Sequence, residues 1–432
     1  MDHVAALLTQ YFPGSDRELR VGGVSIREIA DKFGTPFFAY DASVLDRKWA
    51  LLRETLPPEF SICYSVKANP NRAILRRFLE KGAGLEIASA GELRQALTAG
   101  CPPERILFAG PGKTEAELEA ALASGVGEIH VESALEARRI SAVARRLGTQ
   151  ARVGLRVNPG AEVQGGAMRM GGKPAPFGVD EESLDEVTDA LLADPAVDFR
   201  GLHIFSGTQI LDATVLVNQY RRGLEIARRL AGRLGHPLAT LDFGGGLGVP
   251  YFATERPLDT HKLREQLQAL MAEIEGDRRL AGTRFLVEPG RYLVAEAGIY
   301  VARINDIKVS RGKTFYIVDG GMNHHLAASG NLGQVIKRNF PLAVVTRLGA
   351  ESSQTVDVVG PLCTPLDTLA RDAMLALAEV GDLVGIFQSG AYGLTASPIG
   401  FLSHATPAEV LAADGVTTLI RPRLRMEDVL PS

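Results

Sequence analysis

Residues 61–75, SICYSVKANPNRAIL, contain a strand, a loop and the start of a helix, which together make one β/α unit. Residues 61–66 form a short apolar run typical of a buried strand, and Asn69 and Pro70 interrupt the chain before the helical segment. Lys67 ends the apolar run, where an unpaired buried charge is costly. It is either a surface lysine at a strand end or a desolvated amine that forms a Schiff base with an aldehyde cofactor.

Similar apolar runs alternate with amphipathic segments from about residue 37 to about residue 282. Eight strand-like runs joined by helix-like segments are what a (β/α)8 barrel requires. A doubly wound open sheet is the alternative, but the number and length of the runs favour the barrel. The runs are PFFAY, ICYSV, GLEIAS, ILFAG, EIHVE, ARVGLRV, GLHIFSG and TLDFGGG.

The remaining sequence predicts a second domain of a different kind. Residues 283–432 contain β-type runs without intervening helices, and residues 1–36 are expected to be the N-terminal segment of this β-domain. The fold class is therefore α/β: a barrel over residues 37–282 and a C-terminal β-rich domain. The Gly-rich residues 161–175 follow a strand end, where a barrel carries its active-site loops, so they form either a lid or an ordinary loop.

Composition excludes several classes of protein. The chain has 432 residues, 46% hydrophobic and 23% charged, with a net charge of -4 and no basic stripe for nucleic acid. No apolar run is long enough to predict a membrane span, and the N-terminus lacks the features of a signal peptide. Cys63, Cys101 and Cys363 do not make a disulfide framework. A cytoplasmic protein is expected, and no metal site is predicted.

Two glycine-rich motifs have different interpretations. Three consecutive glycines in DFGGGLG (residues 242–248) follow a strand and can present backbone N–H groups to a phosphate, although a glycine run alone is a weak signal. GPGKT (residues 110–114) lacks the first glycine of a P-loop, because that position is Leu107. We therefore interpret Lys113 as a structural or loop charge.

Other motifs place reactive groups at strand ends and turns. In EPGRYLV, Glu288 can pair with a ring nitrogen and Arg291 with a phosphate, or the two form a turn with a surface ion pair. In GLHIFSGTQ, His203 and Phe205 lie on one side of a strand, and a lone inward histidine is more often a core residue than a catalyst. The loop residue Thr208 offers a hydroxyl to a phosphate. GPLCTPLD and GAYGLTASPIGF, with Cys363, Asp367 and Tyr392, can equally be packed turns.

Eight segments in one order resemble the fold-type III pyridoxal-phosphate decarboxylases, the diaminopimelate and ornithine decarboxylase family. They are SVKANP, LEIASAGEL, GLHIFSGTQ, DFGGGLG, EPGRYLV, VDGGMN, GPLCTPLD and GAYG. Each motif is weak alone, but the series extends from about residue 20 to about residue 405. The resemblance implies a barrel that binds pyridoxal 5'-phosphate, a β-domain, and a head-to-tail homodimer with active sites at the interface.

The resemblance also implies roles for individual residues. Lys67 is the Schiff-base lysine, Glu288 pairs with the pyridine nitrogen, and Cys363, contributed across the dimer interface, donates a proton to the decarboxylated carbon. Thr364, Asp367 and Arg156 are candidate substrate contacts. The roles of His203, His324 and His325 stay open. The implied cofactor contacts are Lys67, Phe205, Thr208, Gly244, Gly245, Gly246, Glu288, Gly290, Arg291 and Tyr392.

Three departures from the family pattern concern the substrate. Thr364 replaces the acidic residue that commonly follows the cysteine and binds a distal amine, and Phe205 replaces a ring-stacking histidine. Glu86 stands where the family usually has aspartate. GPLCTP and HIFSGTQ are more similar to the subgroup that acts on carrier-protein-tethered substrates, and to decarboxylases linked to exosortase systems.

We therefore expect decarboxylation of an amino acid without a distal amine, free or attached to an acyl carrier protein. Diaminopimelate decarboxylase is the first alternative. An amino-acid racemase and a non-catalytic pyridoxal-phosphate-binding protein are less favoured, because the cysteine motif indicates decarboxylation and a non-catalytic protein of this kind is a single barrel without the β-domain.

Overall fold

The computed structural model describes residues 3–160, 168–169, 174–205, 207–332, 334 and 337–428. Residues 161–167 and 170–173 of the expected lid lie outside the described residues, so the lid stays a prediction. The chain divides into two compact units. Unit 1 consists of Met1–Lys48, Pro250–Arg256 and Arg291–Ser432, and unit 2 of Trp49–Val249 and Pro257–Gly290.

Unit 2 is a closed barrel of parallel strands. Within the described residues, eight parallel strands follow one another around a ring, and the β7–β8 and β14–β4 pairings close it. This closure confirms the barrel and excludes the open sheet. The short strand β10 (Val179–Asp180) pairs with β8 outside the ring. The ring strands are β4 (Phe60–Ser65), β5 (Gly84–Ile87), β6 (Ile106–Phe108), β7 (Glu128–Val131), β8 (Ala151–Asn158), β11 (Val197–Ile204), β13 (Thr240–Asp242) and β14 (Arg284–Val287).

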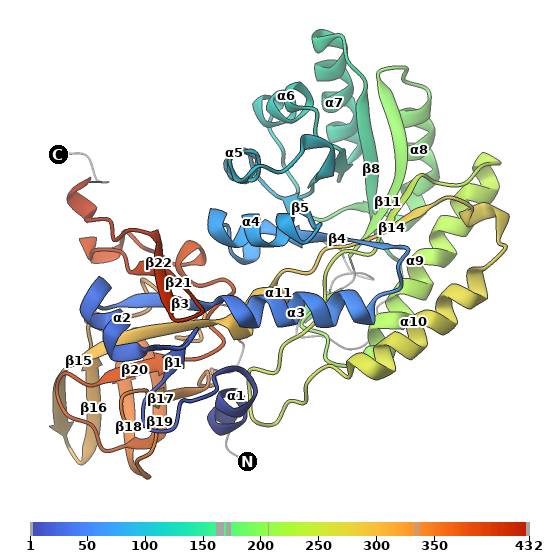
Figure 1. Ribbon diagram of the computed structural model, residues 1–432. Helices are drawn as coiled ribbons and strands as arrows, with labels where there is room; N and C mark the ends of the chain where they lie inside the picture. Colours follow the sequence, from blue (N-terminus) through green and yellow to red (C-terminus); the bar gives the residue numbers. More distant parts are fainter. Residues whose placement is uncertain are drawn as a thin grey trace. The chain divides into compact units, whose positions relative to one another are not determined.

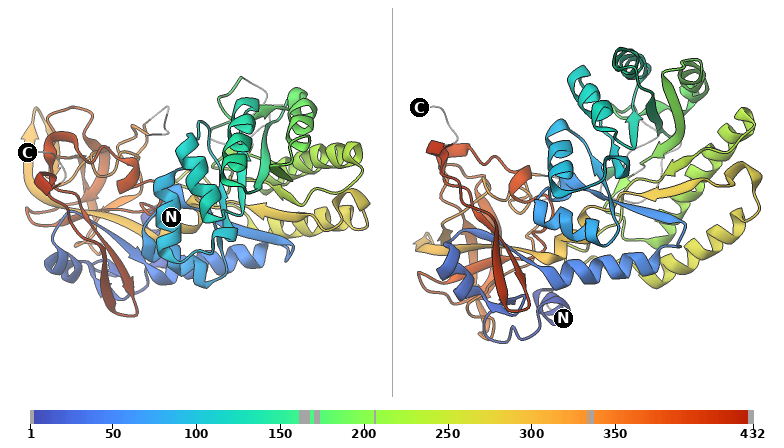
Figure 2. Two further views of the ribbon diagram at one scale, coloured as in Figure 1. Left: turned by 90° about the horizontal axis from the view of Figure 1, so that it is seen from above. Right: turned by 45° about the horizontal axis from the view of Figure 1, so that its top comes forward.

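Helices follow the first seven of these strands, and Figures 1 and 2 show them on the outer side of the strands. Polar N-caps start most of them: Thr114 and Glu117, for example, form a full capping box at α6. Glycines in the left-handed conformation, such as Gly100 and Gly148, end several. These helices are α4 (Arg72–Glu80), α5 (Ala90–Ala99), α6 (Glu115–Ser124), α7 (Ala134–Leu147), α8 (Leu184–Leu192), α9 (Ala213–Leu234) and α10 (Thr260–Ile274).

One strand differs from the prediction. The run PFFAY was expected as the first barrel strand, but β3 (Phe37–Asp41) pairs with β15 (Gly298–Ser310) and β21 (Ala408–Ala413) in unit 1. The barrel strand that the prediction lacked is β14, and unit 2 accordingly starts at Trp49 and ends at Gly290. All five residues of β3 are buried. A short, fully apolar run does not indicate which sheet it joins, because it has no polar face.

Unit 1 is β-rich, as expected. Its main sheet has the order β19-β18-β16-β15-β3-β21-β22, and β20 pairs with both β15 and β17. The N-terminal segment Met1–Lys48 belongs to this unit. Its other elements are α1 (His3–Tyr11), β1 (Arg20–Val21), β2 (Val24–Ser25), α2 (Ile26–Phe33), α11 (Arg291–Val294), β16 (Lys313–Val318), β17 (Leu342–Val344), β18 (Ser352–Val359), β19 (Thr368–Ala376), β20 (Leu383–Ile386) and β22 (Val416–Arg421).

The barrel interior changes character along its axis. Cys63, Leu107 and Leu286 form a buried apolar cluster inside the ring. Polar side chains gather instead at the carboxyl ends of the strands, where Asp242 is the last residue of β13 and Glu288 directly follows β14. A barrel places its active site at that end. In the part of the chain that the structure describes, no helix is long and apolar enough to span a bilayer.

Candidate active site

Lys67 lies just beyond the carboxyl end of β4, in the 3-10 turn Val66–Ala68. Its Nζ is 3.2 Å from both carboxylate oxygens of Glu86, which in turn accepts a hydrogen bond from the Ser65 hydroxyl. The lysine side chain is 48% exposed, whereas that of Glu86 is 1% exposed. Of the two alternatives that the sequence left open, the side chain is thus the half-exposed one: the strand ends at Ser65, so the amine emerges from the barrel wall and meets a buried carboxylate.

The loop after β14 packs closely against this lysine turn. A Cβ atom at Gly290 would lie 2.9 Å from Cβ of Ala68 and 3.1 Å from Cβ of Ser65. Real Cβ contacts are almost never that short, so only glycine allows the two loops to approach. Gly290, assigned as a cofactor contact by resemblance, thus has a packing role that brings Glu288 and Lys67 onto neighbouring loops.

The glycine loop after β13 has the conformation that its sequence predicted. Gly244 and Gly246 have φ angles of 67° and 109°, a region that favours glycine. A Cβ at Gly244 would lie 2.7 Å from Cδ2 of Phe205, so the backbone reaches the aromatic ring only because no side chain intervenes. The Gly244 N–H donates to Asp242 Oδ1 at 2.8 Å, which holds the start of the loop. Gly245 lies between these two positions of positive φ.

Arg156 lies in β8, and Phe205 directly follows the neighbouring strand β11. The guanidinium of Arg156 is 5.9 Å from the centroid of the Phe205 ring, and its Nη1 lies 2.7 Å from Glu132 Oε1. The charge of Arg156 is therefore largely satisfied by a buried glutamate that sequence reasoning missed. Thr208 lies in the two-residue strand β12 (Gly207–Thr208), beyond the end of β11.

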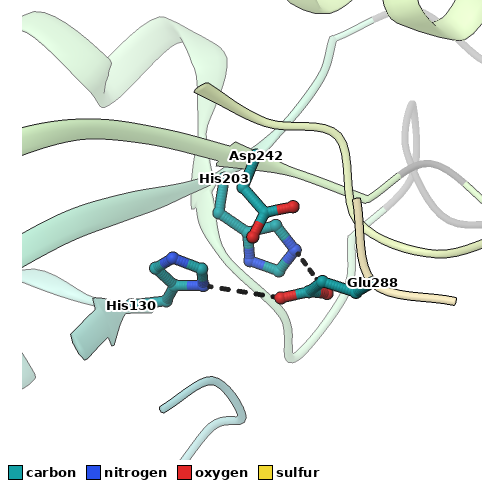
Figure 3. A group of neighbouring side chains, drawn as sticks. All are labelled: His130, His203, Asp242 and Glu288. Carbon is teal, nitrogen blue, oxygen red and sulfur yellow. Dashed lines mark ion pairs between the residues drawn. The ribbon is translucent and has the colours of Figure 1, made fainter. Parts of the chain in front are cut away.

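Four buried side chains meet in the barrel: three from the strands β7, β11 and β13, and Glu288 from just beyond β14 (Figure 3). All four residues are buried. One side-chain atom of each, a ring nitrogen of His130 and His203 and a carboxylate oxygen of Asp242 and Glu288, lies within 4.8 Å of the others. His203 Nε2 is 3.4 Å from Glu288 Oε2, and His130 Nδ1 is 4.0 Å from Glu288 Oε1. The two imidazole rings are 4.5 Å apart. Sequence reasoning left His203 open and missed His130 and Asp242; the signal was that HVE, HIF and LDF each put a polar side chain into the barrel.

Burial controls the protonation of this group. It lowers the pKa of His203 to about 4, so this imidazole is neutral at neutral pH. Burial, and next the charge of Glu288, raise the pKa of Asp242 well above its usual value. Burial acts against ionisation of Glu288 too, but His203, then His130 and Lys67, hold its pKa below the usual range. Glu288 is therefore the carboxylate of this group that carries the charge.

Unit 1 contains the other candidate residues. Arg291 donates from Nη1 to the Tyr251 hydroxyl at 3.2 Å, and its guanidinium lies 4.6 Å from the Tyr392 ring centroid. Tyr392 has a φ of 53°, and a left-handed conformation is uncommon for an aromatic residue. The buried Nε of Arg291 has no hydrogen-bond partner among the described residues. The structure thus brings Arg291 and Tyr392 together and adds Tyr251, which the sequence did not indicate.

The Cys363 loop has an exposed thiol and a buried acid. Cys363 is exposed, and Thr364 beside it is half-buried. Asp367 is 2% exposed and accepts backbone N–H groups from Met322 at 2.7 Å and Leu362 at 2.9 Å. Burial, partly opposed by these two N–H groups, raises its pKa. Both oxygens of Asp367 are therefore engaged in holding the loop, which leaves the thiol of Cys363 and the hydroxyl of Thr364 at its surface.

His324 and His325, whose roles the sequence left open, are buried in unit 1. His324 lies 3.2 Å from the Tyr300 hydroxyl and 3.0 Å from the carbonyl of Ala405. His325 Nε2 lies 2.9 Å from the Ser389 hydroxyl. Burial lowers the pKa of His324 to about 4 and that of His325 to about 3. Both imidazoles are therefore neutral members of the core at neutral pH.

Acidification is expected to destabilise the protein through His325. The folded imidazole stays neutral down to about pH 3, whereas an unfolded histidine takes up a proton near pH 6.5. Because the unfolded state binds the extra proton, stability is lost as the pH falls. From about pH 7.5 to about pH 5 this histidine should remove about 2 kcal/mol from the free energy of unfolding. Urea titrations of the wild type and His325→Gln at both pH values measure it: an equal loss in the variant contradicts the assignment.

The residues of unit 2 fit the cofactor that the resemblance implied. Glu288 Oε1 is buried and has no hydrogen-bond partner among the described residues, so it can pair with the ring nitrogen of pyridoxal phosphate. In the loop of Gly244, Gly245 and Gly246, Asp242 takes the N–H of the buried Gly244, and the half-buried Gly245 and Gly246 bring a backbone without side chains to the surface, which suits a phosphate. Lys67 offers an exposed amine for the aldehyde carbon. In unit 1, the incompletely bonded guanidinium of Arg291 also fits an anion.

Comparisons with known proteins agree with this chemistry. Residues 42–295 match the family described as "Pyridoxal-dependent decarboxylase, pyridoxal binding domain". The L-glutamyl-(BtrI acyl-carrier protein) decarboxylase of Niallia circulans is 38% identical over 408 residues, covering 94% of this chain and 95% of that relative. The diaminopimelate decarboxylase of Zymomonas mobilis subsp. mobilis is 33% identical over 419 residues, with 95% and 96% covered.

A solved structure shows the same fold. The diaminopimelate decarboxylase from Helicobacter pylori, complexed with L-lysine, has a TM-score of 0.81 and 30% sequence identity, covering 93% of this chain and 98% of that one. The family match covers more than half of the chain, and the relatives match nearly all of it. The chain therefore belongs to the pyridoxal-dependent decarboxylase family and is an amino-acid decarboxylase that uses pyridoxal phosphate.

Proposed function

We propose that this decarboxylase acts on an amino acid that lacks a distal amine and is attached to an acyl carrier protein. The relative from Niallia circulans supports this, because its name specifies a glutamyl group on a carrier protein and it is 38% identical over nearly the whole chain. Decarboxylation of free diaminopimelate is the alternative, supported by relatives such as the enzyme from Zymomonas mobilis at 33% identity.

The main support for this proposal is that the Cys363 loop has no free carboxylate. A distal ammonium on the substrate needs a carboxylate opposite it, and the segment GPLCTPLD contains one acid, Asp367. Asp367 is 2% exposed and both of its oxygens accept backbone N–H groups. Thr364, which stands where relatives commonly have an acid, supplies only a neutral hydroxyl. The loop therefore offers no charge for a distal amine.

Phe205 favours the same class of substrate. Its ring can stack against the cofactor but cannot donate a hydrogen bond or carry charge. The adjacent Arg156 is paired with Glu132 at 2.7 Å, so it adds little net charge to this side. A thioester on the distal carboxyl group removes the charge of that group and leaves the α-amine and the α-carboxylate free to react, which suits these neutral surroundings.

The chain's own residues have complementary tasks in the reaction. When bound, pyridoxal phosphate supplies an electron-withdrawing ring that accepts the electron pair released with CO2. We assign Glu288 to the ring nitrogen, and Gly244, Gly245, Gly246 and Arg291, assisted by Tyr392 and Thr208, to the phosphate. These contacts would orient the cofactor, and the Lys67 amine would hold its aldehyde group.

Cys363 is assigned to the last proton transfer. Its thiol is exposed on a loop that Asp367 anchors, so it is available to a partner molecule. We propose a homodimer in which each subunit supplies Cys363 to the active site of the other, where the thiol protonates the carbon that has lost CO2. The proton moves from Sγ to carbon, and the resulting thiolate is reprotonated from solvent.

Release of CO2 from matched substrates tests the proposal. The purified enzyme is supplied with free glutamate, free diaminopimelate, free lysine and glutamate loaded on a carrier protein through its phosphopantetheine arm. We expect a kcat/KM at least about tenfold higher on the loaded carrier, since each 1.4 kcal/mol of selective binding gives that factor. Efficient turnover of free diaminopimelate or lysine, with the loaded carrier ignored, would refute the proposal.

Substitution of Thr364 should change substrate preference. Thr364→Glu places a carboxylate where relatives bind a distal amine, so turnover of diaminopimelate should rise by about tenfold relative to the wild type. Turnover of the loaded carrier should fall because the new charge is not paired. Thr364→Val is the matched control, since it alters the hydroxyl without adding charge and should not increase turnover of diaminopimelate. No gain with Thr364→Glu would show that other residues set specificity.

A further inference from the structure

The buried cluster of His130, His203, Asp242 and Glu288 occupies one layer of the barrel. His203 in β11 lies opposite Asp242 in β13, and His130 in β7 lies opposite Gly154 in β8. A Cβ at Gly154 would be 2.8 Å from Cδ2 of His130, so the imidazole occupies the space that a side chain of β8 would otherwise fill. Side chains from β7, β11 and β13 and from the residue after β14 thus meet in one place. Figure 3 shows them directed toward one another.

Two carboxylates in this layer compete for one negative charge. Asp242 is 0% exposed and Glu288 is 6% exposed, with one oxygen of each inside the 4.8 Å group. Two buried carboxylates this close cannot both ionise without a large cost, so one of them keeps a proton. Asp242 lies deeper, at the end of a strand, whereas Glu288 lies beyond the strand end on the loop next to the Lys67 turn.

Neighbouring groups in and around this layer favour the charge on Glu288. His203 and His130 approach Glu288 from β11 and β7, and Lys67 after β4 also stabilises its ionised form. Glu128, deeper in β7, lies 3.2 Å from Nε2 of His130 and adds to the repulsion on Asp242. Arg156 of β8, Cys63 of β4 and the buried Tyr220 of α9 also act on this layer through Coulombic effects.

The oxygens of Asp242 are used differently. Oδ1 accepts the Gly244 N–H at 2.8 Å and so holds the glycine loop. Oδ2 is buried and has no hydrogen-bond partner among the described residues, and neither has Glu288 Oε1. A proton on Oδ2 gives this atom a hydrogen bond to donate to the Glu288 carboxylate, because one oxygen of each residue lies within 4.8 Å of the other, and the carboxylate keeps further lone pairs for the ring nitrogen.

We propose that Asp242 is a neutral hydrogen-bond donor that, together with His203, keeps the Glu288 carboxylate ionised and directed toward the cofactor's ring nitrogen. Asp242 and His203 are positioning residues, since they act through Glu288. Asp242 also connects the two ends of the cofactor site, because its other oxygen holds the glycine loop assigned to the phosphate. The inference rests on the assignment of Glu288 to the ring nitrogen and not on the identity of the substrate.

Two substitutions of Asp242 distinguish whether this side chain acts as a neutral hydrogen-bond donor or as an anion. Asp242→Asn keeps an oxygen for the Gly244 N–H and an N–H group for Glu288, so it imitates the protonated acid. Asp242→Ala removes both. The readouts are the Kd of the apoprotein for pyridoxal phosphate, from fluorescence quenching, and the 15N chemical shift of the labelled ring nitrogen in the holoenzyme. Neither readout needs a substrate, so they stay informative if the carrier proposal fails.

The inference predicts different results for the two variants. Asp242→Asn should bind the cofactor within about threefold of the wild type with the ring nitrogen still protonated, whereas Asp242→Ala should bind about tenfold more weakly or worse. If Asp242→Ala does not fold, the asparagine variant decides alone. Loss of ring protonation in Asp242→Asn would overturn the proposal, because it would show that aspartate acts as an anion. Stoichiometric zinc in the holoenzyme, lost in Asp242→Asn, would overturn it also.

His203 gives an independent test of the same idea. His203→Gln retains a neutral N–H donor and should keep the ring nitrogen protonated, whereas His203→Leu should shift its protonation to lower pH. For the Asp242 variants, Asp357→Ala is the matched control. Asp357 is also a buried aspartate, 6% exposed, that accepts a backbone N–H at 2.7 Å, but it lies in unit 1. It should lower thermal stability without changing the 15N shift. Equal 15N shifts in the two His203 variants and the wild type would exclude a role for His203.

Discussion

Lys67→Ala is expected to abolish covalent retention of the cofactor and to lower CO2 release by at least about a thousandfold. The amine is the group that binds the aldehyde carbon, and the loss of a residue with both covalent and proton-transfer roles gives a reduction of this order. The readouts are the mass of the protein after borohydride reduction with pyridoxal phosphate, and the rate of CO2 release from the preferred substrate.

Two controls isolate the amine from its charge. Lys67→Arg keeps a cation opposite Glu86, whose carboxylate lies 3.2 Å from the lysine, yet it cannot form the covalent bond and should be as inactive as the alanine variant. Lys308→Ala removes an exposed lysine of β15 and should retain the covalent adduct. If reduced Lys67→Ala carried the cofactor at the wild-type level, another lysine would have to be the attachment site.

Glu288→Gln is expected to lower kcat by about a hundredfold or more, the effect of removing a group that stabilises charge developing in the transition state. The glutamine occupies nearly the same volume but has no charge to keep the ring nitrogen protonated. The ring then withdraws electrons less strongly when CO2 leaves. Stopped-flow measurement of CO2 release, together with the 15N shift of the ring nitrogen, tests the expectation.

Glu296→Gln is the matched control for this substitution. Glu296 is also 6% exposed and buried beside a cation, Lys48, at 2.5 Å, but both residues belong to unit 1. Its replacement should reduce stability and leave the ring nitrogen protonated. Should Glu288→Gln retain a protonated ring nitrogen and wild-type kcat, the assignment of Glu288 would be wrong, and the inference about Asp242 would fail with it.

Local patterns predicted most of the barrel. Seven of the eight predicted runs overlap barrel strands, because each alternates with a helix whose caps are visible in the sequence, as at Thr114 and Gly100. The exception is β3 (Phe37–Asp41), which is as apolar as a barrel strand but pairs with β15 and β21. Its place depends on distant partners, which no local pattern encodes.

The candidate site shows the same division. Motifs identified Lys67, Glu288 and the glycine loop, because each has a residue type or backbone conformation that its chemistry requires. The exposure of Lys67 was left open, since whether a strand-end side chain is covered depends on neighbouring loops. Asp367 was expected to contact the substrate, but one of its oxygens holds its own loop at Leu362 and the other the segment at Met322, and we therefore propose a positioning role for it.

The sequence by itself determined the barrel, the β-rich unit, the cofactor and the family, because periodicity and spaced motifs are local properties. Only the tertiary structure decided which strand completes the barrel and that Glu86 faces Lys67. It also decided that His130, His203 and Asp242 share one buried space with Glu288. The physical reason is that pairing of distant strands sets which polar groups are removed from water together, and this shared burial sets their charges.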